Sequence, residues 1–549
     1  MALISFKQFT WSRALALSMG LMVLPLGLQA QSATTGSAAI HDRGLPTLGD
    51  ANSQTLSPAA ERHLGDRIMR TILSDPDVVD DPLVLEYVQD IWTSLLASAR
   101  QRGDIGEELD ATYAWTPFVV RDKTINAFAL PGGYIGVHLG LLALTRTPEE
   151  LASVLAHEMS HVTQRHIARM MSQSKQTSWV SLATMVLGAL AMSRSPQGAQ
   201  ALIMSGQGLA AQGQLNFSRD MEREADRVGF GVLTEAGYSP AGMTQMFEQL
   251  QQASRLNDDN NFPYLRTHPM TTERIGEARA RMGAEGLVYK KTRGGFLSER
   301  SQLLALRHAL MAARARVLMD KKSTALQTWL KPPALPKDAG LNEQLAQQYT
   351  SLVAATQLQD RETIDRALTK AQAIASDMPA AEAREARRLL TLADIEARIE
   401  TSRPTSAQTV LGEALARPNG DLHPFGRPEI LLKARTALNQ PDARDQATLL
   451  QDAVNGLQTH LASHADDITG WTLLSSAWTR LGQPLRAIRA DAEATAASGD
   501  LRGAIDRVEA ARKRFAQPTA ADLIELSVLD ARVVRWRQTL KDDAREELN

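Results

Sequence analysis

Hydrophobic positions recur with helical spacing along most of the chain, and one short section breaks that pattern. Ser57-Pro58 supplies an N-cap and a first-turn proline, and the amphipathic pattern after it predicts one helix over 57–98. Thr147–Glu150 repeats this start with the glutamate of a capping box, so a second helix is predicted over 148–171. A third is predicted over 219–236, where a glycine follows its last residue.

The section between the first two helices has the composition of a small sheet. Thr112–Val120 is rich in strand-forming residues. Ala127–Leu130 and Tyr134–Val137 flank Pro131-Gly132-Gly133, which indicates a hairpin or a sharp turn at a sheet edge. Strands and helices together predict an α+β domain over residues 57–290.

The second half of the chain, at 297–549, changes to Ala, Leu, Arg, Gln and Asp in helical periods, which predicts an all-α domain. Breaks are expected at 331–337 and 417–428, where Pro, Gly and Asn gather. The pattern at Gly482–Ile488 recurs at Gly499–Ile505, about half of the ~34-residue tetratricopeptide period later.

A tetratricopeptide solenoid is therefore predicted for this half. One repeat can be laid on three large positions followed by two small ones, where the small residues let paired helices approach and the large ones fill the gap: Trp471, Leu474, Trp478, Ala487 and Ala494. An irregular helical bundle is the alternative, because repeats before residue 440 are degenerate. A concave stack of such helices holds a peptide or protein partner.

Segment 176–218 carries a single charged residue, Arg194, and an apolar run from Trp179 to Met192. The run is too short to span a bilayer comfortably. A buried helical hairpin or a flap over the active site is one interpretation, and peripheral membrane contact is the other.

The N-terminus has the pattern of a secretory signal peptide at 1–30. Lys7 and Arg13 precede an apolar stretch, and Leu28-Gln29-Ala30 ends it with a small residue at the cleavage position. A retained anchor is the alternative. Residues 31–56 are small and polar, which predicts a flexible arm. We expect the mature protein to reside in a bacterial periplasm.

The composition excludes several classes of protein and of site. The chain has 549 residues, 44% of them hydrophobic, and a net charge of −2, so a strongly basic nucleic-acid-binding protein is excluded. It contains no cysteine, which excludes disulfides, thiolate metal sites and a lipoprotein anchor.

His157-Glu158-Met159-Ser160-His161 is an HExxH motif on the predicted helix 148–171. Residues four apart share a helical face, so both imidazoles can bind one Zn²⁺ while Glu158 addresses the water as general base. The expected cofactor is therefore Zn²⁺, one per chain.

A catalytic zinc needs a third protein ligand and one open position. His166 does not fit the metzincin pattern, which requires Gly and His where this chain has Gln164 and Ile167. We expect His166 to be a surface or packing residue. His268, in a Thr-His-Pro loop, has three open roles: a transition-state donor, a fourth ligand of a resting form, or a structural loop residue.

Glu222 is the better candidate for the third ligand, and Asp226 lies one turn further on the same helical face. Two stacked carboxylates repel each other unless cations lie between them. Zinc on Glu222, and a zinc-binding histidine that donates its other N–H to Asp226, would meet that need. The alternative is an exposed acidic face paired with Arg223 and Arg227.

Four motifs resemble those of the gluzincin peptidases related to HtpX and the CAAX prenyl protease: HEMSH at 157–161, SRDMEREAD at 218–226, NAFALPGG at 126–133 and THP at 267–269. The exported N-terminus and the helical second half resemble the periplasmic members of this group. The resemblance covers essentially the whole mature chain and implies an α+β zincin (gluzincin) peptidase domain followed by an all-α tetratricopeptide-repeat solenoid.

The resemblance also implies residue roles. His157, His161 and Glu222 would bind zinc, Glu158 would be the general base, and Asp226 would support the site or donate a proton. His268 would occupy the open position and hold the enzyme latent. An extended substrate would add to an edge strand at 126–137, with binding residues Ala127, Phe128, Ala129, Leu130, Gly132 and Gly133.

The implied function is a periplasmic zinc endopeptidase that degrades misassembled outer-membrane proteins and assists β-barrel assembly. Its partners would be stalled β-barrel proteins and the barrel assembly machinery. The alternative is a chaperone-like scaffold that acts through its helical half, with a structural or vestigial zinc site; Glu158 argues against it, because a structural zinc needs no water-activating residue.

Overall fold

The computed structural model describes residues 56–173, 217–256, 263–292, 299–417, 420–441 and 446–547. The predicted signal peptide and nearly all of the predicted arm lie outside the described residues, and so does almost all of the apolar segment 176–218. What the sequence predicts for these segments stays a prediction.

The first predicted helix is two helices. Helix α1 (Pro58–Leu73) begins at Ser57, whose hydroxyl accepts a hydrogen bond from the N–H of Ala60 (3.2 Å). Helix α2 (Pro82–Arg102) begins at Asp81 through a similar cap. Prediction of one helix over 57–98 is wrong because Pro76 disfavours helical geometry in the residue before it.

The small sheet has the strand order β1-β3-β2. Strands β2 (Ala127–Leu130) and β3 (Tyr134–His138) form the predicted hairpin, antiparallel to each other. Strand β1 (Thr116–Val120) is parallel to β3 and shorter than predicted, because helix α3 (Glu107–Thr112) ends at Thr112 and Trp115, with a φ of 51°, interrupts the extended backbone. Strand β2 is therefore an edge of the sheet.

The turn between β2 and β3 is a packed corner. Gly132 and Gly133 have φ values of 75° and 87°, which favour glycine. A Cβ on Gly132 would lie 2.8 Å from the Cα of Arg62 in α1, and the carbonyl of Gly133 accepts from the N–H of Thr116 (3.1 Å). This packing explains why both positions are glycine, and their predicted role in substrate binding stays a prediction.

The second predicted helix is also divided. Helix α5 (Pro148–Thr163) carries the HExxH motif and begins at the predicted Thr147 cap. Helix α6 (His166–Gln173) follows after Arg165, which has a φ of 52°. The Arg165 guanidinium donates to the buried carboxylate of Glu61 in α1 (Nε–Oε1 2.8 Å), which holds this strained residue in place.

The core of the part at 56–292 surrounds α2 and α5. Apolar side chains of α2 are fully buried, and the indole N–H of Trp92 donates to the carbonyl of Trp115 (2.7 Å). The remaining helices of this part are α4 (Leu139–Leu144), α10 (Arg219–Glu235), α11 (Ala241–Leu256), α12 (Pro263–Thr267) and α13 (Thr272–Thr292). The predicted third helix is confirmed as α10.

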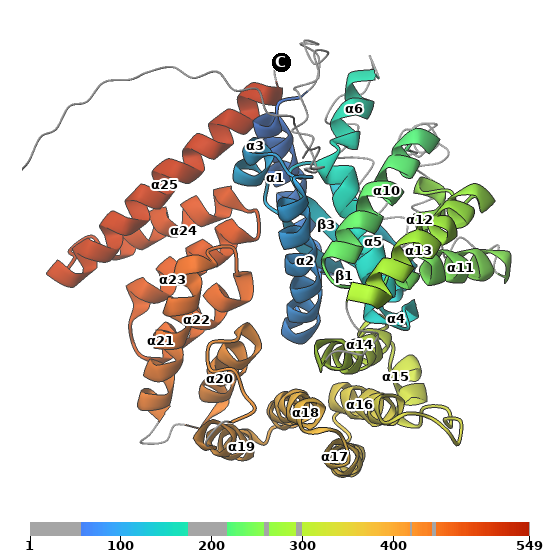
Figure 1. The fold of residues 1–549 in the computed structure, drawn as a ribbon. Helices are drawn as coiled ribbons and strands as arrows, with labels where there is room; N and C mark the ends of the chain where they lie inside the picture. Colours follow the sequence, from blue (N-terminus) through green and yellow to red (C-terminus); the bar gives the residue numbers. More distant parts are fainter. Residues whose placement is uncertain are drawn as a thin grey trace, which may run out of the picture. The chain divides into compact units, whose positions relative to one another are not determined.

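The described residues from 299 onward form helices without a strand, as predicted (Figure 1). The expected breaks at 331–337 and 417–428 are present. These helices are α14 (Glu299–Leu318), α15 (Ser323–Leu330), α16 (Leu341–Leu358), α17 (Arg361–Ser376), α18 (Ala380–Glu400), α19 (Pro404–Ala416), α20 (Arg427–Asn439), α21 (Gln446–Ser463), α22 (Ile468–Arg480), α23 (Pro484–Ala497), α24 (Leu501–Arg514) and α25 (Ala520–Glu547).

Ion pairs of arginine join the helices from residue 299 onward to the part at 56–292. Arg388 in α18 is 1% exposed and bonds both Glu86 of α2 (Nη2–Oε1 2.8 Å) and Glu429 of α20 (Nε–Oε1 2.7 Å). At the other end, the partly buried Arg70 of α1 bonds Asp543 near the C-terminal end of α25 (2.7 Å), and this end of α25 lies next to α1 in Figure 1. Removing one partner of a buried pair leaves an uncompensated charge, so these contacts fix the arrangement.

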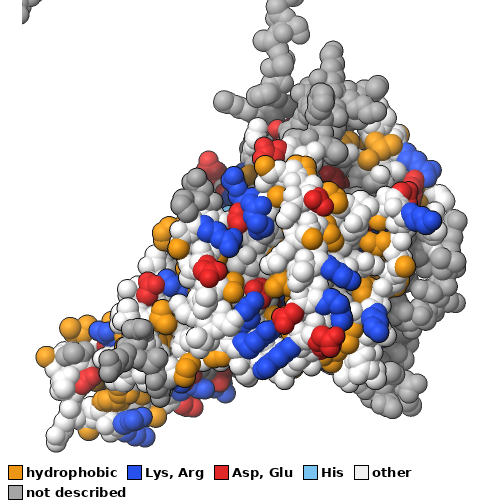
Figure 2. All heavy atoms as spheres, turned by 90° about the horizontal axis from the view of Figure 1, so that it is seen from below, with side chains coloured by type: hydrophobic (Ala, Val, Ile, Leu, Met, Phe, Trp, Pro, Cys, Tyr) orange, Lys and Arg blue, Asp and Glu red, His pale blue; other side chains and the backbone are white. Residues whose placement is uncertain are grey.

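The surface of the described part carries both signs of charge. On the face in Figure 2, Lys and Arg side chains lie among Asp and Glu side chains, and pairs such as Arg387 and Asp421 (3.0 Å) are in ionic contact. This face therefore has no field of one sign. No described helix is both long enough and apolar enough to cross a membrane.

Candidate metal centre

Two helices bring the predicted site residues together. On α5, His157 and His161 are one turn apart and share a face. Helix α10 crosses α5 closely at Gly229, where a Cβ would lie 3.0 Å from the carbonyl oxygen of Ala156. The absence of a side chain at Gly229 lets the backbones approach, and Glu222 of α10 is thereby placed beside the two histidines.

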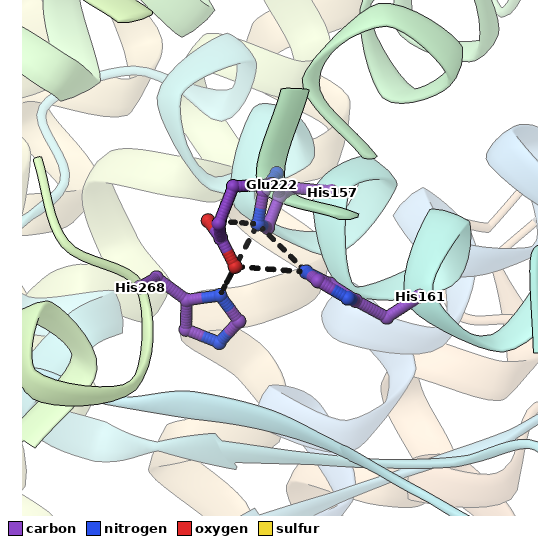
Figure 3. A group of neighbouring side chains, drawn as sticks. All are labelled: His157, His161, Glu222 and His268. Carbon is purple, nitrogen blue, oxygen red and sulfur yellow. Dashed lines mark hydrogen bonds and ion pairs between the residues drawn. The ribbon is translucent and has the colours of Figure 1, made fainter. Parts of the chain in front are cut away.

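Four buried side chains converge on one point: His157, His161, Glu222 and His268 each offer a ligand atom, and these atoms lie within 4.8 Å of one another. The Nε2 atoms of His157 and His161 are 3.0 Å apart, and Glu222 Oε1 lies 3.5 Å from His161 Nε2. His268, after α12, completes the group with Nδ1 2.9 Å from Glu222 Oε1 (Figure 3).

This donor set suits a divalent metal ion such as zinc. Imidazole nitrogens and a carboxylate oxygen are its usual ligands, and the Nε2 atoms of the two histidines converge to 3.0 Å. The structure thus groups the three predicted ligands, and it places His268 with them rather than in a remote loop.

Glu158 lies next to this group of ligand residues. Its side chain is completely buried, and neither carboxylate oxygen makes a hydrogen bond within the described residues. Burial raises the pKa of Glu158, although His268, His157 and the backbone amide of Ala129 oppose that rise. Glu158 Oε1 has a long ionic contact with His268 Nε2 (3.5 Å). A buried carboxyl without a close hydrogen bond is costly to maintain, and a proton acceptor needs this freedom.

Asp226, the second carboxylate of α10, contacts the Nδ1 side of the His157 ring. Its Oδ1 lies 3.0 Å from His157 Nδ1, and Arg274 of α13 bonds both of its oxygens (2.6 and 2.7 Å). The Nη1 atom of Arg274 also reaches Glu222 (2.7 Å). One buried guanidinium therefore offsets the repulsion between the two carboxylates that the sequence places one turn apart.

These contacts shift the titration of the site. Burial opposes the charged form of His157, but Asp226 and Glu222 outweigh it and raise its pKa to about 9. Burial also opposes ionised Glu222, yet His268 and His157 hold its pKa well below its usual range. Burial and the neighbouring histidines His157 and His268 push the pKa of His161 far down. The negative charge of the ligand set thus rests on Glu222.

Comparison with known proteins decides the class. Residues 88–282 match the family model described as Peptidase family M48. The chain carries an M48 peptidase domain. It is a metallopeptidase, and its M48 domain holds the HExxH motif, Glu222 and His268.

Relatives extend the similarity beyond the M48 domain. The chain is 28% identical over 519 residues to the beta-barrel assembly-enhancing protease of Yersinia pestis, covering 93% of this chain and 95% of that one. The Escherichia coli K12 protein of that name is 27% identical over 500 residues, or 90% and 91% of the two chains. A Vibrio cholerae protein to which the same name is assigned provisionally is 36% identical over 237 residues. That alignment covers 43% of this chain and 47% of the Vibrio protein.

Sequence reasoning missed two neighbours of the site in the M48 domain. Arg274 could have been sought, because two stacked buried acids require a cation and it follows closely on the Thr-His-Pro motif. Tyr264 stacks on His268 (ring centroids 4.6 Å apart). Its local sequence carries no signal for this, because the contact joins α12 to the loop after it.

The remaining predicted substrate residues lie on β2. Ala127 and Leu130 are buried in the two apolar clusters that flank the sheet, whereas Phe128 and Ala129 are partly exposed. The Phe128 ring packs edge-on against Phe118 (5.8 Å). The structure thus places these residues on the free edge of the sheet, and their contact with a substrate stays a prediction.

Asp226→Asn is expected to weaken zinc binding by about 10–100-fold, because the residue that orients a metal-binding histidine would lose its charge. The measurement is a zinc dissociation constant from competition with a chromogenic chelator. Asp220→Asn is the matched control, because Asp220 lies on the same helix with its side chain 86% exposed and paired to Arg223. Equal affinities in both variants would show that Asp226 does not orient His157.

Proposed function

We propose that this metallopeptidase is a periplasmic zinc endopeptidase that acts in the assembly and quality control of outer-membrane β-barrel proteins. The observation that carries the peptidase activity is the convergence of His157, His161 and Glu222 beside the buried carboxylate of Glu158. A purely structural zinc site would have no use for that carboxylate.

Each residue has a role in this chemistry. His157, His161 and Glu222 would hold the ion, which when bound polarises the scissile carbonyl and acidifies the attacking water. Glu158 accepts a proton from that water and passes it to the leaving amine, since its oxygens are buried and free of other hydrogen bonds. Asp226 keeps His157 in the tautomer whose Nε2 is available as a ligand.

Substrate binding is proposed along β2. An extended peptide can add to a sheet edge through main-chain hydrogen bonds, and β2 is the edge strand next to α5. Ala129 of β2 lies near enough to Glu158 for its backbone amide to lower the pKa of that carboxyl. A peptide aligned on β2 would therefore pass beside the proton acceptor.

The biological role is proposed from the relatives and from the N-terminus. Two relatives that match more than 90% of their own length are named for enhancing β-barrel assembly. The signal-peptide pattern at 1–30 supports export to the periplasm. Helices α22, α23 and α24 begin at Ile468, Pro484 and Leu501, which supports the predicted tetratricopeptide repeat. This half is proposed to bind stalled barrel proteins or the assembly machinery.

Complementation tests this role. An Escherichia coli strain without its own relative of this chain would be supplied with the full chain or with Glu158→Gln, and the amounts of assembled outer-membrane barrels would be compared. We expect only the unaltered chain to clear stalled barrels. Full rescue by Glu158→Gln would instead favour the scaffold function, in which the helical half acts without proteolysis.

His268 is proposed to keep the resting enzyme latent, because it lies within the ligand group where an open position is needed. His268→Ala is expected to raise cleavage of an unfolded barrel protein several-fold. The measurement is the initial rate of fragment release, with His268→Ala/Glu158→Gln as a control for contaminating proteases. A lower rate in His268→Ala would identify His268 as a participant in the reaction instead.

A further inference from the structure

His166 contacts the side of His161 that faces away from the ligand group. Its Nδ1 lies 2.9 Å from His161 Nδ1, and its Nε2 lies 3.0 Å from Glu224 Oε2 on α10. His166 is 0% exposed, and the Phe217 ring stacks on His161 (centroids 3.9 Å apart). The histidine that the sequence marks as a surface or packing residue is therefore the partner of a metal ligand.

The break in the HExxH helix makes this contact feasible. Residues five apart on an unbroken helix point in different directions, so His166 could not reach the ring of His161. Arg165, with its φ of 52°, ends α5 and redirects the chain into α6. Its bond to Glu61 supports this conformation from α1, so the placement of His166 is built into the fold.

Metal binding by His161 fixes which nitrogen donates and which accepts in each of these hydrogen bonds. A histidine that binds a metal through Nε2 carries its proton on Nδ1. His161 Nδ1–H must then donate to His166 Nδ1, which leaves the proton of neutral His166 on Nε2. That N–H donates to the carboxylate of Glu224, which also accepts from Arg169 (2.8 Å).

The two histidines of the motif are thus supported in parallel ways. Asp226 Oδ1 lies 3.0 Å from His157 Nδ1 and faces that atom directly, whereas Glu224 reaches His161 Nδ1 through one intervening imidazole. Outer partners of this kind fix the ring orientation and the tautomer of a metal ligand.

We propose that His166 and Glu224 are positioning residues that hold His161 in its ligand tautomer. This inference rests on the proposed metal centre. Neither residue touches the substrate or the reacting atoms, so both act only through His161. A purely structural role for His166 would affect the stability of the metal-free chain and leave zinc affinity unchanged.

The test measures the zinc dissociation constant of the full chain by chelator competition, together with the melting temperature of the metal-free form. His166→Phe preserves an aromatic side chain of similar size but leaves His161 Nδ1–H without an acceptor, and Glu224→Leu removes the end of the chain of hydrogen bonds. Both are expected to weaken zinc binding by about 10–100-fold.

Two variants serve as controls. Arg169→Gln alters the other partner of Glu224 and should bind zinc within about threefold of the parent chain. Glu224→Gln loses the charge but keeps an oxygen that accepts from His166, so it should weaken zinc binding less than Glu224→Leu does. Parent-like affinity in His166→Phe and Glu224→Leu would overturn the inference. If His166→Phe does not fold, the contrast between Glu224→Leu and Glu224→Gln decides whether the inference holds. A parent chain that binds no zinc would refute the proposed function itself.

Discussion

Glu158→Gln is expected to reduce proteolysis by several orders of magnitude while zinc content stays normal. The substitution leaves His157, His161 and Glu222 in place and removes only the group that accepts the proton. The measurement combines the rate of cleavage of an unfolded barrel protein with elemental analysis of the same sample. Because a latent enzyme cleaves slowly, the comparison should also be made in the His268→Ala background.

Glu107→Gln provides the control for that experiment, because Glu107 is exposed in α3 and belongs to no part of the site. It should cleave at the rate of the parent chain. Appreciable residual cleavage by Glu158→Gln would refute the assignment of the base, and loss of zinc in that variant would mean that Glu158 stabilises the ligand set.

Arg274→Met is expected to destabilise the metal-free chain by about 3–5 kcal/mol, the usual consequence of removing one partner from a buried ion pair. Arg274 is 4% exposed and its guanidinium bonds Asp226 and Glu222, so the variant leaves two buried carboxylates without this cation. The measurement is thermal unfolding with and without added zinc. Zinc should stabilise the variant more than the parent, because a cation would again lie beside Glu222.

Arg279→Met is the matched variant, because Arg279 lies on the same helix and its pair with Glu248 is exposed (58% and 46%). Such surface pairs contribute about 0–1 kcal/mol. If Arg274→Met unfolds no more easily than Arg279→Met, Arg274 does not offset the two carboxylates.

Local signals in the sequence predict the elements that carry the site. The cap at Thr147, the HExxH spacing and the turn at Gly132-Gly133 each depend on neighbouring residues, and the structure has α5 and the β2–β3 hairpin where they indicate. Glu222 and Asp226 could be assigned to one face of α10 because helical spacing alone places them there.

Long-range contacts account for what the sequence did not predict. The end of α5 depends on Arg165, whose partner Glu61 is 104 residues away in the chain. Parallel pairing of β1 with β3 likewise joins segments that are not neighbours in sequence. His166 was predicted to be a packing or surface residue because its spacing fits no zinc-ligand pattern, and only the break before α6 places it behind His161.

The central claim is that His157, His161 and Glu222 form a zinc centre in the M48 domain. Elemental analysis of the purified mature chain beside Glu222→Ala tests it most directly, and it does not depend on relieving latency. We predict a zinc-to-protein ratio near one that collapses in Glu222→Ala. A ratio near zero in the parent chain, after controls for metal stripping, would contradict the account and favour the scaffold function.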